Sequence, residues 1–176
     1  MSRIMVVDDE DNILRALRRV LSGNDQDVEL FSNPHEALRR AQVAIFDLII
    51  SDYRMPDMDG VRFLCEVKKL QPESMRIIIS GHADMQGLLG AINEAEIFRF
   101  VRKPWDDYDL QAAVQSALLH RSVLVENRRL ADQVRRQREI LHRQSAAIRN
   151  LETQYPGLTK VNWGVDGSVI MEDYDI

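Results

Sequence analysis

The sequence is poor in several features that would place it in particular protein classes. It has one cysteine, Cys65, which excludes an intrachain disulfide and is typical of a protein kept in a reducing compartment. No apolar run approaches the roughly 20 residues that a membrane-spanning helix needs, and the apolar stretch 4–7 is too short for the core of a signal peptide. We therefore expect a cytoplasmic protein without a membrane segment.

An excess of positive charge is also missing. The 23 basic residues are outnumbered by 28 acidic ones, and the formal net charge is -5. Overall charge therefore gives no reason to expect nucleic-acid binding. With 45% hydrophobic and 29% charged residues the composition is that of an ordinary globular protein, and 176 residues allow one domain plus an appendage.

The first two thirds of the chain alternate short apolar runs with amphipathic segments. The runs at 3–7, 28–31, 45–51, 76–79 and 97–101 are expected to be strands. The segments at 11–21, 61–70 and 85–95 are expected to be helices, as are one that begins at Pro34 with Asn33 as its N-cap and a long one that begins near Asp107. Strands separated by helices favour a parallel sheet covered by helices on both faces.

Polar side chains follow four of the expected strands. They are the pair Asp8-Asp9, then Asp52, then Ser80 and finally Lys103. Open α/β sheets bind ligands at the carboxyl ends of their strands. Crowded carboxylates repel one another, and a hard cation such as Mg²⁺, which prefers oxygen ligands, relieves this repulsion. A carboxylate can act as a covalent nucleophile, and a lysine can neutralise charge on a transferring phosphoryl group. The pattern therefore predicts a phosphoryl-transfer site.

Each of these residues also has a simpler interpretation, which stays open at this point. Asp8 or Asp9 could cap the first helix. Ser80 could be a turn residue, and Lys103 could be a surface lysine. The joint occurrence of all of them with Asp52 favours the site.

In this order and at these spacings, the residues resemble the receiver domain of bacterial two-component response regulators. The resemblance covers roughly residues 2–121 and rests on Asp8-Asp9, Asp52, the loop MPDMDG at 55–60, Ser80-Gly81 and Lys103-Pro104. The segments SDYRMPDMDG and FRFVRKPW look most like receivers associated with HD-GYP-type regulators. The resemblance implies an α/β, flavodoxin-like fold with a five-stranded parallel sheet in the order 2-1-3-4-5 and helices on both faces.

The resemblance also implies roles in phosphoryl transfer. Asp52 takes the phosphoryl group from a sensor histidine kinase or a small phosphodonor. Asp9 and Asp52 bind Mg²⁺ directly, Asp8 acts largely through water, and the backbone carbonyl of Arg54 supplies another oxygen. Lys103 contacts the phosphoryl oxygens.

Two residues are implied to form a switch. Ser80 would hydrogen-bond the phosphoryl group, and its movement would let Phe100 turn inward. A cis peptide bond is implied before Pro104. The alternative that Phe100 is simply a core residue stays open.

The segment from Asp107 to about residue 151 contains no proline or glycine and carries a heptad pattern from Val123 onward. Position a holds Asn127, Val134, Leu141 and Ile148, and position d holds Val123, Leu130, Gln137, Gln144 and Leu151. This pattern predicts a parallel two-stranded coiled coil, and hence a homodimer through residues 122–152, with the asparagine fixing register. A single amphipathic helix that folds back on the first domain is the alternative.

Arginines line the outward positions of this helix. Position b holds Arg121, Arg128, Arg135 and Arg149, and position c holds Arg129, Arg136 and Arg143. A solvated face is the first interpretation and an acidic partner the second. DNA binding is unlikely because no nucleic-acid reader module follows. Leu124, Val125 and Ile140 lie outside the seam and either broaden the contact or mark a partner surface.

The chain is thus expected to have a receiver domain over 1–121, a coiled-coil helix over 122–152 and a short tail over 153–176. In the tail, residues 160–163 and 168–171 flank a glycine-containing turn and predict a small β-hairpin. The apolar residues of such a hairpin would need a surface to pack on.

The expected function is that of a phosphorylation-activated response regulator that controls an unknown downstream protein. Such a receiver catalyses only its own phosphoryl transfer and dephosphorylation. The alternative is a piece or relative of a longer regulator with an enzymatic output, such as a cyclic-di-GMP phosphodiesterase, outside this chain. A phosphatase of the haloacid dehalogenase type is disfavoured, because Arg54 stands where that group has a second aspartate.

Overall fold

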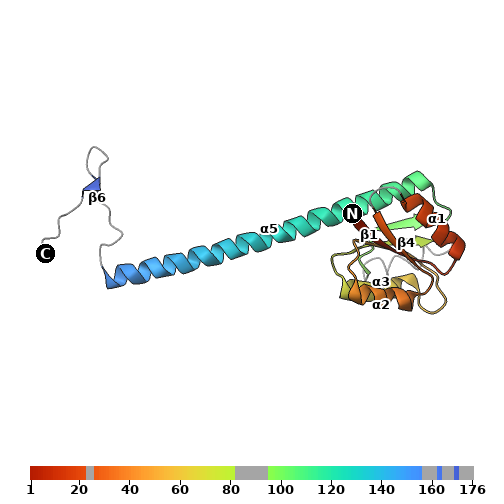
Figure 1. Ribbon diagram of the computed structural model, residues 1–176, viewed down its shortest axis with the longest axis horizontal. Coiled ribbons are helices and arrows are strands. Elements are labelled where there is room, and N and C mark those ends of the chain that lie inside the picture. The colour runs from red at the N-terminus through yellow and green to blue at the C-terminus, as the bar shows by residue number, and fades with distance from the viewer. Residues whose placement is uncertain (23–25, 82–94, 156–161, 164–168, 171–176) are drawn as a thin grey trace. The chain divides into compact units, whose positions relative to one another are not determined.

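The computed structural model describes residues 1–22, 26–81, 95–155, 162–163 and 169–170 (Figure 1). Its elements are β1 (Ser2–Val7), α1 (Asp11–Leu21), β2 (Gln26–Phe31), α2 (Pro34–Val43), β3 (Leu48–Asp52), α3 (Gly60–Leu70), β4 (Met75–Ser80), β5 (Arg99–Arg102), α5 (Asp107–Gln154), β6 (Asn162–Trp163) and β7 (Val169–Ile170). Almost all of the helix predicted over 85–95 lies outside the described residues.

The first five strands form one parallel sheet in the order β2-β1-β3-β4-β5. This confirms the flavodoxin-like architecture predicted from the sequence. Every residue of the central strands β3 and β4 is buried, as a sheet covered on both faces requires. The edge strand β2 differs, because all six of its residues are only half-buried.

Two hydrophobic cores lie on the two faces of this sheet. One packs against α1 and the first turns of α5, and the other against α2 and α3 (Figure 1). The start of α5 contributes Leu110, Ala113, Val114 and Ala117, whose spacing of three and four residues places them on one side of a helix. The two faces of the sheet thus hold the strand ends in fixed positions.

Local signals explain where the helices begin. The Asn33 side chain accepts hydrogen bonds from the N–H groups of His35 and Glu36, which confirms it as the cap of α2. The Asp59 side chain accepts from the Arg62 N–H and caps α3. The N-cap of α1 is Glu10, so the interpretation of Asp8 or Asp9 as the cap of this helix is wrong.

Two strand boundaries differ from the prediction. The third strand begins at Leu48 and not at residue 45, because Ile45 is 71% exposed and the Phe46 N–H donates to the Gln71 side chain. The fifth strand begins at Arg99 and not at residue 97. Both errors arose because apolar residues directly precede the strand and look like part of it in the sequence. The other strands extend the predicted ranges by one or two residues.

The chain divides into two compact units, 1–127 and 128–176. In the second unit, α5 continues to Gln154, and β6 pairs with β7 in antiparallel fashion through Asn162–Ile170 and Trp163–Val169. The apolar residues at the a and d positions of this part of α5, which would form the coiled-coil seam, are exposed to solvent. Each is about half exposed: Leu130, Val134, Leu141, Ile148 and Leu151. None of the described helices has the length and apolar character to cross a membrane.

Candidate phosphoryl-transfer site

The Lys103 ammonium joins two of the predicted carboxylates. Its Nζ lies 2.6 Å from Asp52 Oδ1 and 2.8 Å from Asp8 Oδ2. These residues come from the ends of β1 and β3 and from the loop after β5, so the parallel topology brings together positions up to 95 residues apart. Lys103 is followed by a cis peptide bond to Pro104, as the resemblance implied.

Two hydrogen bonds fix the position of Asp52. Its Oδ2 accepts a hydrogen bond from the Arg54 N–H at 2.6 Å, and its backbone carbonyl accepts one from the Ser51 hydroxyl. The side chain is largely buried at the last position of β3. One carboxylate oxygen therefore faces the lysine while the other is oriented by the following turn.

Gly60 is a positioning residue that sequence reasoning missed. A Cβ at this position would lie 2.0 Å from the Asp52 carbonyl oxygen, so only glycine lets the start of α3 approach the end of β3 so closely. The Gly60 N–H also donates to the Tyr53 carbonyl and closes the loop. A glycine placed directly after the helix-capping residue Asp59 was the available signal.

Glu10 is a second residue that the prediction left out. Its N–H donates to Asp8 Oδ1 at 2.9 Å, and its Oε1 lies 4.0 Å from Lys103 Nζ. The run of three acids Asp8-Asp9-Glu10 was the signal in the sequence. Glu10 thus orients Asp8 and adds negative potential at the rim of the site.

Burial and ion pairing act against each other at this site. Burial raises the pKa of Asp8, and the Lys103 ammonium and the Glu10 N–H offset only part of this effect. Burial disfavours the charged form of Lys103, but its hydrogen bonds to Asp52 and Asp8 outweigh burial and raise the pKa of this lysine. The site therefore holds a firmly charged cation beside a carboxylate that is costly to ionise.

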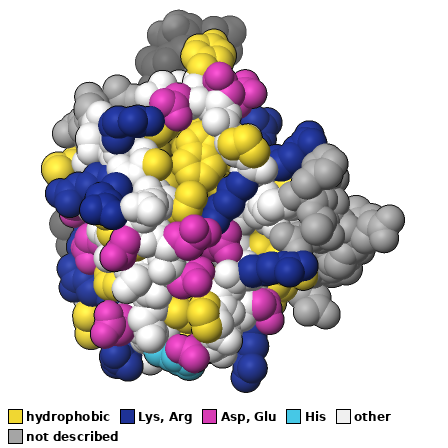
Figure 2. All heavy atoms as spheres, turned by 90° about the vertical axis from the view of Figure 1, so that its right-hand side faces the viewer, with side chains coloured by type: hydrophobic (Ala, Val, Ile, Leu, Met, Phe, Trp, Pro, Cys, Tyr) yellow, Lys and Arg dark blue, Asp and Glu magenta, His cyan; other side chains and the backbone are white. Residues whose placement is uncertain are grey.

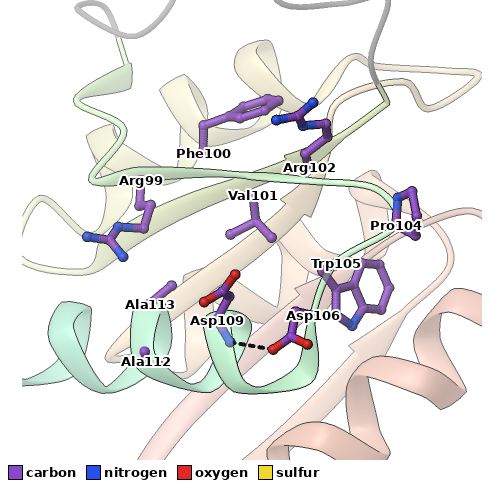
Figure 3. A pocket seen from close by; sticks show the side chains of 10 residues that line it. All are labelled: Arg99, Phe100, Val101, Arg102, Pro104, Trp105, Asp106, Asp109, Ala112 and Ala113. Atoms are coloured by element: carbon purple, nitrogen blue, oxygen red, sulfur yellow. Dashed lines mark hydrogen bonds between the residues drawn. The ribbon is translucent and has the colours of Figure 1, made fainter.

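The other predicted site residues lie around this centre. Asp9 is exposed, while Ser80 is buried at the end of β4. Phe100 is half-buried and packs against the core formed with α2 and α3. In Figure 3 it points to the side of β5 opposite Val101, which faces α5. This position suits both a switch and a plain core residue.

The carboxylate oxygens of the site are ligands of the kind that Mg²⁺ prefers. Asp8 and Asp52 both approach Lys103 Nζ, so their oxygens converge, and Mg²⁺ is usually held by one or two carboxylates plus water. Within the described ranges, no three carboxylate, histidine or cysteine groups gather closely enough to form a complete metal cage. The residues therefore fit a hydrated ion.

One face of the molecule combines acidic groups with apolar and basic ones (Figure 2). Figure 2 shows acidic side chains gathered near the centre of one face of the molecule, beside basic and hydrophobic ones. A cavity of about 580 Å³ lies apart from Asp52, between β5 and the first turns of α5, and Trp105 and Pro104 line it (Figure 3). The candidate centre is thus built from the buried carboxylates Asp8 and Asp52 with Lys103, none of which lines this cavity.

Comparison with known proteins agrees with this geometry. Residues 4–115 match the response regulator receiver domain family. The hydrogenase transcriptional regulatory protein HoxA of Bradyrhizobium diazoefficiens is 38% identical over 115 residues, which are 65% of this chain and 24% of that protein. The transcriptional regulator NtrC of Salmonella typhimurium is 32% identical over 117 residues, 66% of this chain and 25% of that protein. The chain thus spans about a quarter of the length of these relatives.

Among solved structures, the signal receiver domain of an HD domain-containing protein from Pseudomonas fluorescens Pf-5 is 34% identical with a TM-score of 0.66. The match covers 69% of this chain and 98% of that one. The matched range contains Asp8, Asp52 and Lys103, the carboxylates and the lysine that the structure brings together. The chain belongs to the response regulator receiver family, and its aspartate–lysine site is consistent with a phosphoacceptor centre.

Proposed function

We propose that this chain is a phosphorylation-activated response regulator in which Asp52 accepts the phosphoryl group. The observation that carries the proposal is the Lys103 ammonium 2.6 Å from Asp52 Oδ1. An Asp52 oxygen attacks phosphorus, the bond from phosphorus to the phosphohistidine nitrogen of a sensor kinase breaks, and an acyl phosphate forms. Lys103 is placed to neutralise charge on the phosphoryl oxygens during this transfer.

Magnesium is the implied cofactor. Asp8, Asp9 and Asp52, with the backbone carbonyl of Arg54, would hold it, and the ion would supply positive charge opposite the phosphoryl oxygens. The convergence of Asp8 and Asp52 on one lysine supports a shared cation site.

The switch proposal concerns Ser80 and Phe100. Ser80 is buried at the end of β4, and Phe100 lies on the neighbouring strand β5. Once the acyl phosphate forms, the Ser80 hydroxyl would donate to a phosphoryl oxygen, and Phe100 would turn into the space that Ser80 leaves.

We further propose a parallel homodimer through residues 122–152, with the receiver over 1–121 and a tail over 153–176 that ends in a small hairpin. The half-exposed seam residues Leu130, Val134, Leu141, Ile148 and Leu151 support this dimer, because a second copy would cover them. Phosphorylation would change the receiver surface and the dimer arrangement, and so control a downstream protein.

A second candidate is a receiver whose output is a cyclic-di-GMP phosphodiesterase outside these 176 residues. The resemblance of SDYRMPDMDG and FRFVRKPW to HD-GYP-associated receivers and the similarity to the Pseudomonas receiver of an HD domain-containing protein favour it. The curated relatives instead are named transcriptional regulators. The proposed phosphorylation of Asp52 is common to both candidates.

The test is transfer from acetyl phosphate in the presence of Mg²⁺, followed by intact-mass measurement and peptide mapping. We expect one phosphoryl group on Asp52 in the unmodified chain, none in Asp52→Asn, and normal labelling in Asp57→Asn, which removes an exposed carboxylate from the same loop. Labelling of Asp52→Asn at the wild-type level would overturn the proposal.

A further inference from the structure

The apolar surface of α5 beyond Arg128 is wider than a two-stranded seam requires. Position g holds Ile140 and Ala147, and position e holds Ala131 and Ser145, all of them exposed. The Ile140 side chain is 55% exposed, as open as the seam residues themselves. A strict a/d stripe suffices for two strands, whereas a wider stripe is typical of helices that contact more than one neighbour.

Ion pairs between the e and g positions do not link the two copies of the proposed dimer. In a parallel pair each g residue meets the following e residue of the other copy. Gln133 would meet Arg138, Ile140 would meet Ser145, and Ala147 would meet Glu152. None of these combinations joins opposite charges, and the residue that would face Ile140 across the pair, Ser145, has a short side chain.

Basic side chains lie on either side of Ile140. Arg136 and Arg143 lie four residues before and three residues after Ile140, which places both next to it on the helix surface, and both are exposed. Over 128–149 there are seven arginines and only two acids, Asp132 and Glu139. The Asp132 carboxylate lies 3.5 Å from Arg135, so little acid is left to balance the flank that carries Arg136 and Arg143.

An exposed isoleucine flanked by arginines favours one kind of binding partner. A second pair of the same helices would bring arginine rows against arginine rows, and like charges at this distance repel. Nucleic acid would contact the arginines but would gain nothing from Ile140. A helix with an apolar stripe and a row of carboxylates would satisfy both features.

We propose that α5 docks an acidic amphipathic helix of a partner protein on the exposed face centred on Ile140, with Arg136 and Arg143 pairing its carboxylates. The proposal rests on the parallel dimer of the proposed function. Charge would set the orientation of the partner helix, and contact with Ile140 would distinguish it from polyanions in general.

The test uses the full chain and a synthetic helical peptide of about three heptads with leucine at a and d and glutamate at the outward positions. Fluorescence anisotropy gives its affinity, and light scattering gives the mass of the complex. We expect the peptide to bind the dimer, and a matched peptide with lysine in place of glutamate to bind at least tenfold more weakly. Ile140→Ser should weaken binding about fivefold, and Arg136→Gln with Arg143→Gln about tenfold. Arg62→Gln, which removes an exposed arginine far away in sequence, should leave it unchanged.

Four results would overturn the inference. They are equal affinity for the two peptides, wild-type affinity in Ile140→Ser, displacement of the peptide by double-stranded DNA at equal charge concentration, and a complex of one chain with one peptide. The mass of the protein alone separates this inference from the dimer on which it rests. A monomer would overturn both, whereas a dimer that ignores the peptide would overturn this inference only.

Discussion

At the scale of single residues, the ionised carboxylate of the buried Asp8 lowers the stability of the folded protein. Its raised pKa, caused by burial, means that the folded protein holds a proton on Asp8 more firmly than the unfolded chain does. The free energy of unfolding therefore falls as pH rises from the ordinary range of an aspartic acid, near about 3.9, through the raised pKa. At neutral pH the ionised side chain is a cost of folding.

Asp8→Asn should therefore raise the melting temperature at pH 7 by a few degrees, roughly the effect of 1 kcal/mol. The gain should shrink as pH falls below the raised pKa of Asp8, because the side chain is then protonated in the folded wild type, and it should vanish below the ordinary range of an aspartic acid. Lys103 keeps Asp52 as a partner in this variant. Thermal unfolding in a chelator-containing buffer measures the effect, with Asp57→Asn as the exposed control. A lower melting temperature for Asp8→Asn at pH 7 would show that the ion pair with Lys103 outweighs burial.

Gly60 gives a second prediction at this scale. Gly60→Ala places a methyl group 2.0 Å from the Asp52 carbonyl oxygen, so the start of α3 or the end of β3 must shift. We expect a loss of several kcal/mol in the free energy of unfolding, against about 0.5 kcal/mol or less for Arg62→Ala on the exposed side of the same helix. Urea unfolding of the two variants is the measurement, and equal stability would refute the close approach.

The sequence predicted the residues whose chemistry is visible in their type and place. Asp8, Asp52, Ser80 and Lys103 each follow a strand, and strand ends are readable from apolar runs. Gly60 was missed because its role depends on the distance between two backbones. Its place directly after the capping residue Asp59 indicates a helix start but does not reveal the contact with the Asp52 carbonyl. The roles of Asp9, Arg54 and Phe100 depend on a bound ion or an acyl phosphate, and they remain predictions.

At the scale of elements, an ion pair fastens α5 to the sheet at the end opposite the site. Arg121 Nη1 lies 2.5 Å from Asp47 Oδ1, both side chains are about four-fifths buried, and Asp47 Oδ2 also accepts the Arg3 N–H. Asp47 directly precedes β3, the strand that ends in Asp52. The strand that ends in Asp52 is thus linked to α5 at its other end.

Removal of the arginine should be costly because it leaves a largely buried carboxylate without its charge partner. For Arg121→Gln we expect a loss of about 2 kcal/mol in the free energy of unfolding. Arg135→Gln, which breaks an exposed pair 3.5 Å long with Asp132, should change it by about 0.5 kcal/mol or less. Denaturant unfolding followed by circular dichroism compares them, and equal losses would contradict a special role for Arg121.

The elements themselves were largely predictable. The helix and strand order and the caps Asn33 and Asp59 follow from periodicity and local hydrogen bonding. The start of β3 was not predictable, because Ile45 and Phe46 look like strand residues, whereas the Phe46 N–H is captured by Gln71, 25 residues away. Contacts of this kind are set by tertiary packing.

At the scale of the whole molecule, the proposed homodimer depends on contact between the α5 helices of two copies. Leu141 is 60% exposed at a seam position, and the neighbouring His142 occupies an outward one. Leu141→Asp should place two carboxylates in the seam and convert the dimer to a monomer. His142→Asp introduces the same side chain next to it and should leave the dimer intact. Light scattering distinguishes them, and both should still accept phosphate on Asp52. If both variants remained dimers, or if both became monomers, the result would contradict the predicted seam.

The most direct test of the central claim is sedimentation velocity of the full chain with Mg²⁺, with and without beryllofluoride, which mimics a phosphoryl group on Asp52. The account predicts a dimer in both conditions and a change of sedimentation coefficient with beryllofluoride, which Asp52→Asn abolishes. The same coefficient with and without beryllofluoride, or an equal change in Asp52→Asn, would contradict the claim that Asp52 controls the arrangement of the dimer.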